Sequence, residues 1–335
     1  MENSPLIVAE MSANHNQSLD RALAIVDAAA KAGAHAVKLQ TYTPDTMTLP
    51  GVFTIEDENS LWQGMDLYEL YQKAHTPWEW HKPLFDRARE LGITAFSTPF
   101  DATAVEFLEE LGNPIYKVAS FENTDIPLMG TIARTGKTVI LSTGGADLAQ
   151  ISRAVTTLKE NGCTDLTLLK CTSAYPAPVS SCNLLTLPHM AEMFDCKVGL
   201  SDHTQGMGAA LAAVALGARV IEKHFTLDRA DGGVDAPFSM EPSELAQLVA
   251  EADRAHRALG GIQYQVQASE TETVSFKRSL YISRDVAAGE MLTPDNVRII
   301  RPGLGLSPRH YDTVLGRAVK SPLKEGTPLA WAHLA

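Results

Sequence analysis

The chain has 335 residues, with 28 Lys and Arg against 40 Asp and Glu, and a formal net charge of −12. This acidic balance argues against a nucleic-acid or anionic-membrane surface, although a pocket with a few cations can still bind a small anion. No apolar run approaches the roughly 20 residues of a membrane span, and the first residues lack the pattern of a secretory signal. The four cysteines form no CxxC pair. We therefore expect a cytoplasmic α/β protein with reduced thiols.

Short apolar runs alternate with helical patterns through residues 1–260. Eight strands separated by helices favour a (β/α)₈ TIM barrel. A doubly wound sheet is the structural alternative, but no glycine-rich turn follows the first strand. The expected strands are Leu6–Ala9, Ala36–Leu39, Thr94–Ser97, Ile115–Ala119, Thr138–Leu141, Leu166–Lys170, Lys197–Leu200 and Arg219–Glu222. The clearest helical patterns cover Leu19–Ala32, Trp78–Leu91, Thr103–Leu111, Gly206–Leu216 and Leu245–Leu259.

The end of the chain has a different character. A polar linker over 261–275 precedes a segment, 276–335, that Gly and Pro interrupt frequently. Three short strands are expected there, at Ser279–Ile282, Val297–Ile300 and Leu329–Ala332. A module of this size buries little core alone, so docking on a partner would stabilise it.

Polar residues stand at the C-terminal end of every expected strand, where a barrel enzyme carries its chemistry. Lys38 and Lys117 fall within apolar strands, where an unpartnered ammonium would be costly to bury. Two such cations with nearby hydroxyl groups make a pocket for phosphate and carboxylate oxygens. The plain structural alternative is a buried stem with an exposed charged head. The neighbouring hydroxyl groups belong to Thr98, Ser120, Ser142 and Ser201.

Two histidines, His203 and His224, end the last two expected strands. Neutral imidazoles suit a divalent ion such as Mn²⁺, Fe²⁺ or Zn²⁺, with positions left open for water and substrate. Hydrogen bonding to a substrate is the alternative role. Asp202, Glu222 and Asp235 are candidates for supporting or substrate-binding groups.

Eight segments follow one another along the chain: AEMSANHN (9–16), AVKLQTYTPDTMT (36–48), FSTPFD (96–101), YKVASFE (116–122), LSTGG (141–145), KCTSAYPAP (170–178), GLSDHT (199–204) and EKHFTLDR (222–229). Together they closely resemble the sialic acid synthase family. Members of that family condense phosphoenolpyruvate (PEP) with an amino-sugar aldehyde and release phosphate by C–O cleavage. The tail, with Ser279-Leu280 and Arg301-Pro302-Gly303, resembles the small β-rich antifreeze-like (SAF) domain of the same family.

The resemblance implies a role for each matching residue. A divalent metal, Mn²⁺ with Mg²⁺ or Co²⁺ as alternatives, would bind His203 and His224 and polarise the aldehyde. Glu10 would act on water or on sugar hydroxyls, and Lys117 would stabilise charge on PEP. The implied PEP contacts are Lys38, Thr98, Lys117, Ser120, Ser142, Ser173 and Ser201. The implied sugar contacts are Gln40, Glu122, Tyr175, Asp235 and Arg301, with Arg301 reaching the partner barrel in a domain-swapped homodimer.

Three details resemble the pseudaminic acid branch of this family more than the N-acetylneuraminate branch. They are Met-Ser-Ala at 11–13, Ala-Ser-Phe-Glu at 119–122 and Thr-Ser-Ala-Tyr-Pro at 172–176. The implied sugar is 2,4-diacetamido-2,4,6-trideoxy-L-altrose, for which Met11, Ala119 and Phe121 are the expected apolar contacts. An N-acetylneuraminate or legionaminic acid synthase is the alternative within the family. A metal-dependent pyruvate aldolase and a non-catalytic sugar- or ice-binding protein are the alternatives outside it.

Overall fold

The computed structural model describes residues 4–57 and 62–335. The chain divides into two compact units, Met1–Gly260 and Gly261–Ala335. Among the described residues, no helix is both long enough and apolar enough to cross a membrane.

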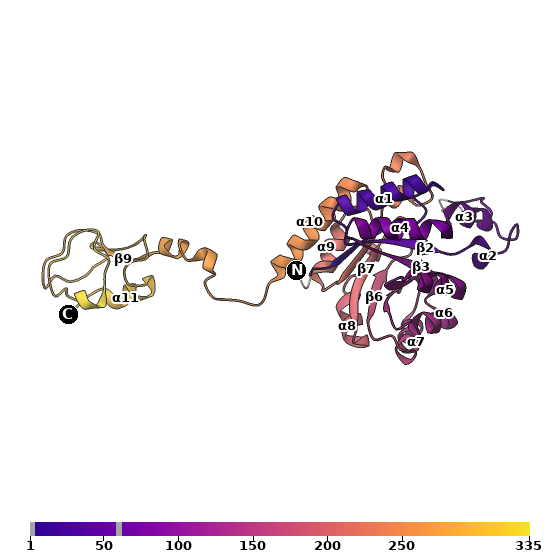
Figure 1. Ribbon diagram of the computed structural model, residues 1–335. Coiled ribbons are helices and arrows are strands. Elements are labelled where there is room, and N and C mark those ends of the chain that lie inside the picture. The colour runs from indigo at the N-terminus through magenta and orange to yellow at the C-terminus, as the bar shows by residue number, and fades with distance from the viewer. Residues whose placement is uncertain (1–3, 58–61) are drawn as a thin grey trace. The chain divides into compact units, whose positions relative to one another are not determined.

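The first unit is a closed barrel of eight parallel strands in chain order, with helices around it (Figure 1). The predicted eight-stranded barrel is confirmed. The barrel closes where β1 pairs with β8, from Leu6 opposite Val220 to Glu10 opposite His224. The strands are β1 (Leu6–Glu10), β2 (Ala36–Thr41), β3 (Thr94–Pro99), β4 (Ile115–Val118), β5 (Thr138–Ser142), β6 (Leu166–Cys171), β7 (Lys197–Asp202) and β8 (Val220–His224).

Helix ends follow ordinary capping chemistry. The Ser18 hydroxyl accepts a hydrogen bond from the Arg21 amide at the start of α1, and Asp101 caps α5. Gly112 ends α5 with a φ of 77°, a conformation that favours glycine. The helices around the barrel are α1 (Leu19–Lys31), α4 (Trp78–Glu90), α5 (Ala102–Leu111), α6 (Ile126–Ala133), α7 (Leu148–Glu160), α8 (Thr186–Phe194), α9 (Gly208–Ala215) and α10 (Pro242–Leu259). Two further helices, α2 (Pro44–Met47) and α3 (Leu67–Ala74), lie between β2 and α4 in the chain.

Alternation along the strands decides which side chains reach the barrel mouth. One buried cluster includes Val8, Ala36 and Val220, whereas their strand neighbours pack in the larger core with the helices. Side chains two residues apart in a strand share a face. Glu10, Lys38 and Glu222 therefore follow Val8, Ala36 and Val220 on the inner face of the barrel.

The same alternation corrects the expectation for Met11. Met11 is fully buried and belongs to the core between barrel and helices, together with Ile7 and Ala9. It therefore cannot serve as an apolar contact of the sugar.

The second unit contains an antiparallel pair, β9 (Ser279–Ile282) and β10 (Val297–Ile300), and one short helix, α11 (Tyr311–Val314). The predicted third strand at Leu329–Ala332 is wrong. The amide of Leu329 bonds to the carbonyl of Leu280, but residues 331–333 then turn into a 3₁₀ helix. The Ala330 amide donates to Nδ1 of His333 at 3.2 Å, so it is not available for a hydrogen bond to a neighbouring strand.

Candidate active site

A cavity of about 360 Å³ opens among the C-terminal ends of the barrel strands. It gathers side chains from strands that are far apart in the sequence, as barrel enzymes do. Twelve predicted site residues line it: Glu10, Lys38, Gln40, Lys117, Ser120, Glu122, Ser142, Tyr175, Ser201, His203, His224 and Asp235.

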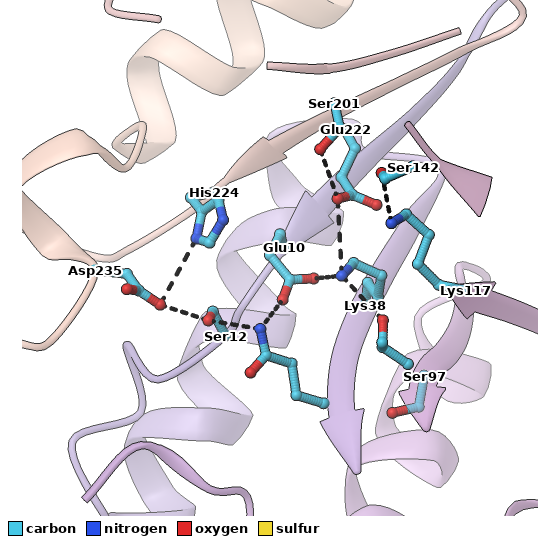
Figure 2. A network of polar contacts seen from close by, with 12 residues as sticks. Glu10, Ser12, Lys38, Ser97, Lys117, Ser142, Ser201, Glu222, His224 and Asp235 are labelled. Carbon is cyan, nitrogen blue, oxygen red and sulfur yellow. Dashed lines mark hydrogen bonds and ion pairs between the residues drawn. The ribbon is translucent and has the colours of Figure 1, made fainter. Parts of the chain in front are cut away.

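A buried charge network crosses the cavity floor (Figure 2). The Lys38 ammonium lies 2.8 Å from Glu10 Oε2 and 3.7 Å from Glu222 Oε1, and it donates to the Thr98 hydroxyl at 3.1 Å. Burial disfavours the charged ammonium of Lys38, but the two carboxylates outweigh burial and raise its pKa. Burial, helped by Glu222, raises the pKa of Glu10 to about 7 despite the attraction of Lys38. Glu10 can therefore gain or lose a proton near neutral pH.

Lys117 is a buried cation of a different kind. Its ammonium donates to the Ser142 hydroxyl at 2.7 Å and to the Val118 carbonyl at 2.9 Å. No carboxylate oxygen in residues 4–57 and 62–335 lies within 4.0 Å of it. Burial lowers the pKa of Lys117, and the attraction of the Glu222 carboxylate offsets this shift only in part. A buried ammonium that is held by neutral groups favours an anionic ligand beside it.

In the loop after β5, the backbone of Gly144 lies close to two serine hydroxyl groups. A Cβ atom on Gly144 would lie 2.2 Å from Ser173 Oγ and 2.6 Å from Ser120 Oγ. A larger residue at this position would therefore have to displace these two hydroxyl groups. On β7, the Ser201 hydroxyl donates to Glu222 at 3.2 Å. Hydroxyls beside Lys117 form a surface suited to phosphate or carboxylate oxygens.

His203 and His224 lie next to each other, with ring centroids 5.3 Å apart. Nδ1 of His203 lies 3.0 Å from the Thr172 carbonyl, so Nδ1 carries the proton and Nε2 keeps its lone pair. Burial lowers the pKa of His203, but the Cys171 thiol and the Thr172 carbonyl raise it by more. Burial, with the neighbouring His203, holds the pKa of His224 well below its ordinary value.

The donor set tests whether a metal fits here. Nδ1 of His224 is buried without a hydrogen-bond partner and lies 3.8 Å from Asp235 Oδ2. The Ser12 hydroxyl donates to that same carboxylate. Within the described part of the chain, no group of three or more His, Cys, Asp or Glu side chains could hold a metal ion. Two imidazole nitrogens beside an anchored carboxylate fit a divalent ion that takes its remaining ligands from water and substrate.

Aromatic rings enclose the histidine pair. Tyr175 lies 4.5 Å from His203 between ring centroids, and Phe238 lies 4.9 Å from His224 and 5.2 Å from Tyr175. Trp62 lies 6.3 Å from Tyr175. Sequence reasoning missed Ser12, Trp62 and Phe238 as site residues. The sequence could have identified Ser12 as a site residue, because it stands two residues beyond Glu10 at the end of β1.

One side of the cavity is apolar, and most of that side comes from the segment between β2 and α4. We call Met47, Ile55, Trp62, Leu67 and Leu70 the apolar wall. Ala119 and Phe121 also line the cavity, as expected from the sequence. The wall itself was missed, since its residues follow no strand-end pattern.

Three of the implied PEP and sugar contacts do not line the cavity, nor does the candidate supporting group Asp202. The Thr98 hydroxyl accepts a hydrogen bond from the Lys38 ammonium. Ser173 lies 3.7 Å from Cys171 Sγ and faces Gly144. Arg301 belongs to the second unit, where its side chain is exposed.

Comparisons with known proteins match both parts of the chain. The NeuB family model matches residues 25–264, and the SAF domain model matches residues 277–335. The chain is 43% identical over 334 residues to the pseudaminic acid synthase of Helicobacter pylori, covering 98% of each chain. It is 43% identical over 326 residues to the pseudaminic acid synthase of Campylobacter jejuni, covering 96% of this chain and 94% of that one. Among solved structures, the N-acetylneuraminic acid synthetase of Leptospira borgpetersenii is 34% identical with a TM-score of 0.73, covering 81% of this chain and 90% of that one.

Proposed function

Because this chain belongs to the NeuB family, we propose that it condenses PEP with 2,4-diacetamido-2,4,6-trideoxy-L-altrose to give pseudaminic acid and phosphate. One observation carries the proposal. A single cavity combines the Lys117 ammonium, whose direct hydrogen bonds go to neutral groups, with the neighbouring imidazoles of His203 and His224. The first suits the anionic substrate, and the second suits an aldehyde-activating metal.

The lysines and hydroxyls account for PEP binding. Lys117 and Lys38 offset the charge of the phosphate and carboxylate groups, and Ser120, Ser142 and Ser173 supply hydrogen-bond donors. Held in this way, C3 of PEP attacks the aldehyde carbon and cationic character develops at C2. Water then adds to C2, and phosphate departs with the electrons of the C2–O bond, leaving the ketone. These lysines also limit where the phosphate can lie.

Glu10 is the proposed acid–base group. Water that adds to C2 must lose a proton, and a carboxylate with a pKa near the working pH accepts it efficiently. The pKa of Glu10 is raised to about 7 by burial. The Gln40 amide donates to Glu10 Oε1 at 3.1 Å and so fixes the orientation of the carboxylate.

His203 and His224 are the proposed ligands of a divalent metal, Mn²⁺ with Mg²⁺ or Co²⁺ as alternatives. When bound, such an ion acts as a Lewis acid on the aldehyde oxygen of the sugar. Asp235 lies beside His224 and is oriented by Ser12. Its carboxylate can accept hydrogen bonds from metal-bound water or from sugar hydroxyls.

The apolar wall supports the choice of sugar. The trideoxy sugar has a methyl group at C6 and a second acetamido group at C4, whereas N-acetylmannosamine has hydroxyl groups at both positions. Burying methyl groups against Met47, Leu67 and Leu70 is favourable by about 0.8 kcal/mol per carbon. Gln40, Glu122 and Tyr175 remain as polar contacts for the other substituents. A synthase for N-acetylneuraminate or legionaminic acid is the second candidate.

We also propose a homodimer in which the second unit of one subunit caps the barrel of its partner and delivers Arg301 to the sugar. Mixing two inactive variants, Arg301→Ala and Lys117→Met, tests this arrangement. With swapped units, each mixed dimer has one intact site of two; because random exchange makes about half of the dimers mixed, the mixture regains about a quarter of the wild-type activity. No recovery after subunit exchange would contradict the swap.

The decisive experiment measures phosphate release from PEP with Mn²⁺ and each of the two sugars. Strong preference for the trideoxy sugar supports the proposal, while preference for N-acetylmannosamine supports the second candidate. Running the reaction in H₂¹⁸O places the label in the keto acid if the C–O bond breaks and in phosphate if the P–O bond breaks.

His203→Ala should abolish turnover. Full activity after exhaustive chelation would contradict the metal assignment, and pyruvate turnover without phosphate release would indicate an aldolase.

A further inference from the structure

The residues directly before the two histidines form an ion pair of their own. Asp202 Oδ2 lies 3.0 Å from the Lys223 ammonium, and each side chain is only 1% exposed. The two residues also face each other in the register of β7 and β8. Of the ion pairs among the described residues, this is the one in which neither side chain exceeds 1% exposure.

This pair lies on the opposite side of the barrel wall from the cavity. Ser201 and His203 point into the cavity from β7, and Glu222 and His224 do so from β8. Asp202 and Lys223 stand between them in the sequence, do not line the cavity, and therefore project outward toward the helices. Neither can touch a substrate at the barrel mouth.

The bonds of the pair enclose the backbone of His203. The Thr204 amide donates to Asp202 Oδ1 at 2.9 Å, and the Lys223 ammonium also donates to the Thr204 carbonyl. Both chain neighbours of His203 are thus tied to Lys223, and Lys223 is itself the neighbour of His224. The spacing of the two imidazoles is therefore fixed through one ammonium group.

Stability alone does not explain this arrangement. Desolvation of two buried charges often exceeds their attraction, and a well-packed apolar pair of similar size is commonly as stable. Directional bonds, however, fix strand ends more narrowly than apolar contacts do. We propose that Asp202 and Lys223 are positioning residues that hold His203 and His224 at the separation a divalent cation requires. This inference rests on the metal assignment of the proposed function.

Mn²⁺ binding to the substrate-free full-length protein, followed by electron paramagnetic resonance, tests the proposal. The double variant Asp202→Leu/Lys223→Met removes both charges together but leaves the buried amide and carbonyl of Thr204 without these partners, so it should fold yet unfold below the wild-type temperature. It should bind Mn²⁺ about 10–100-fold more weakly, the usual effect of losing groups that orient metal ligands. Lys170→Met is the matched control. Lys170 precedes Cys171 at the end of β6, and among residues 4–57 and 62–335 its ammonium donates only to the Cys171 carbonyl, at 3.0 Å.

Asp202→Asn provides a variant that keeps the shape of the side chain. Asp202 accepts from Thr204 with one oxygen and from Lys223 with the other, so the NH₂ group of an amide would face one of these two donors. We expect a folded protein with about tenfold weaker Mn²⁺ binding. Wild-type affinity in Asp202→Asn would overturn the positioning role, whether or not the double variant folds. A wild-type protein that binds no Mn²⁺ would instead overturn the metal assignment, and the positioning role with it.

Discussion

Glu10 and Lys38 face each other in the register of β1 and β2, and their charged groups lie 2.8 Å apart with 1% and 4% of the side chains exposed. The pair keeps a cation at the cavity floor in the absence of any anion. Lys117, by contrast, is held by neutral groups. Both lysines are proposed to bind PEP, but substitution of each should affect protein stability differently.

Lys38→Met should destabilise the protein strongly, because it leaves the Glu10 carboxylate buried without its cation. Breaking a buried pair costs about 3–5 kcal/mol. The double variant Glu10→Gln/Lys38→Met should recover part of that loss, while both variants remain inactive. Chemical denaturation measures the stability. A double variant less stable than Lys38→Met would contradict this account of the pair.

Lys117→Met should affect PEP binding more than protein stability. Removing the buried ammonium relieves its desolvation but also removes its attraction to the buried Glu222 carboxylate, so the loss of stability should be clearly smaller than that of Lys38→Met. PEP binding, measured by calorimetry without sugar, should weaken by at least about tenfold because a charge-assisted bond is lost. A loss of stability as large as that of Lys38→Met would show that Lys117 is structurally paired.

Glu122 should make the stability depend on pH. Burial raises the pKa of its carboxyl from 4.5 to about 7, and one of its oxygens is buried without a partner. The unfolded chain releases this proton at lower pH than the folded protein does, so Glu122 favours unfolding increasingly from about pH 4.5 to pH 7.

Glu122→Gln removes that dependence. Its melting temperature relative to the wild type should therefore rise between pH 5 and pH 8, by about 2–4 °C for each kcal/mol relieved. Glu106→Gln, on the exposed face of α5, is the matched control and should show no such trend. An equal difference from the wild type at both pH values would contradict the shift assigned to Glu122.

Met47→Gln tests the apolar wall with a side chain of similar length. Adding an amide beside the C4 and C6 substituents should lower kcat/KM for the trideoxy sugar and reduce its advantage over N-acetylmannosamine. A change of one apolar group alters such ratios by about 10–200-fold. Met193→Gln, on the exposed side of α8, should leave the ratio unchanged. If Met47→Gln also leaves it unchanged, Met47 does not contact the sugar.

Much of the cavity was accessible from the sequence because strand alternation is a local property. Once Val8 and Ala36 are assigned to the inner face, Glu10 and Lys38 must follow them to the mouth. Met11 was misassigned because proximity to a motif was used in place of that alternation. The strand predicted at Leu329–Ala332 failed for a related reason, since an apolar run does not reveal where the backbone turns.

The sequence by itself determined the eight-stranded order, the polar strand ends and the resemblance to a synthase family, because each depends on short-range periodicity or ordered motifs. Only the tertiary structure decided that Lys38 forms direct ion pairs while Lys117 does not, that Met47 and Trp62 reach the same cavity, and that Phe238 packs against His224. It also decided that Asp202 and Lys223 join the two histidine-bearing strands. These facts depend on distances between residues far apart in the chain. Such distances are set by how the barrel closes and how its loops pack, which no local pattern encodes.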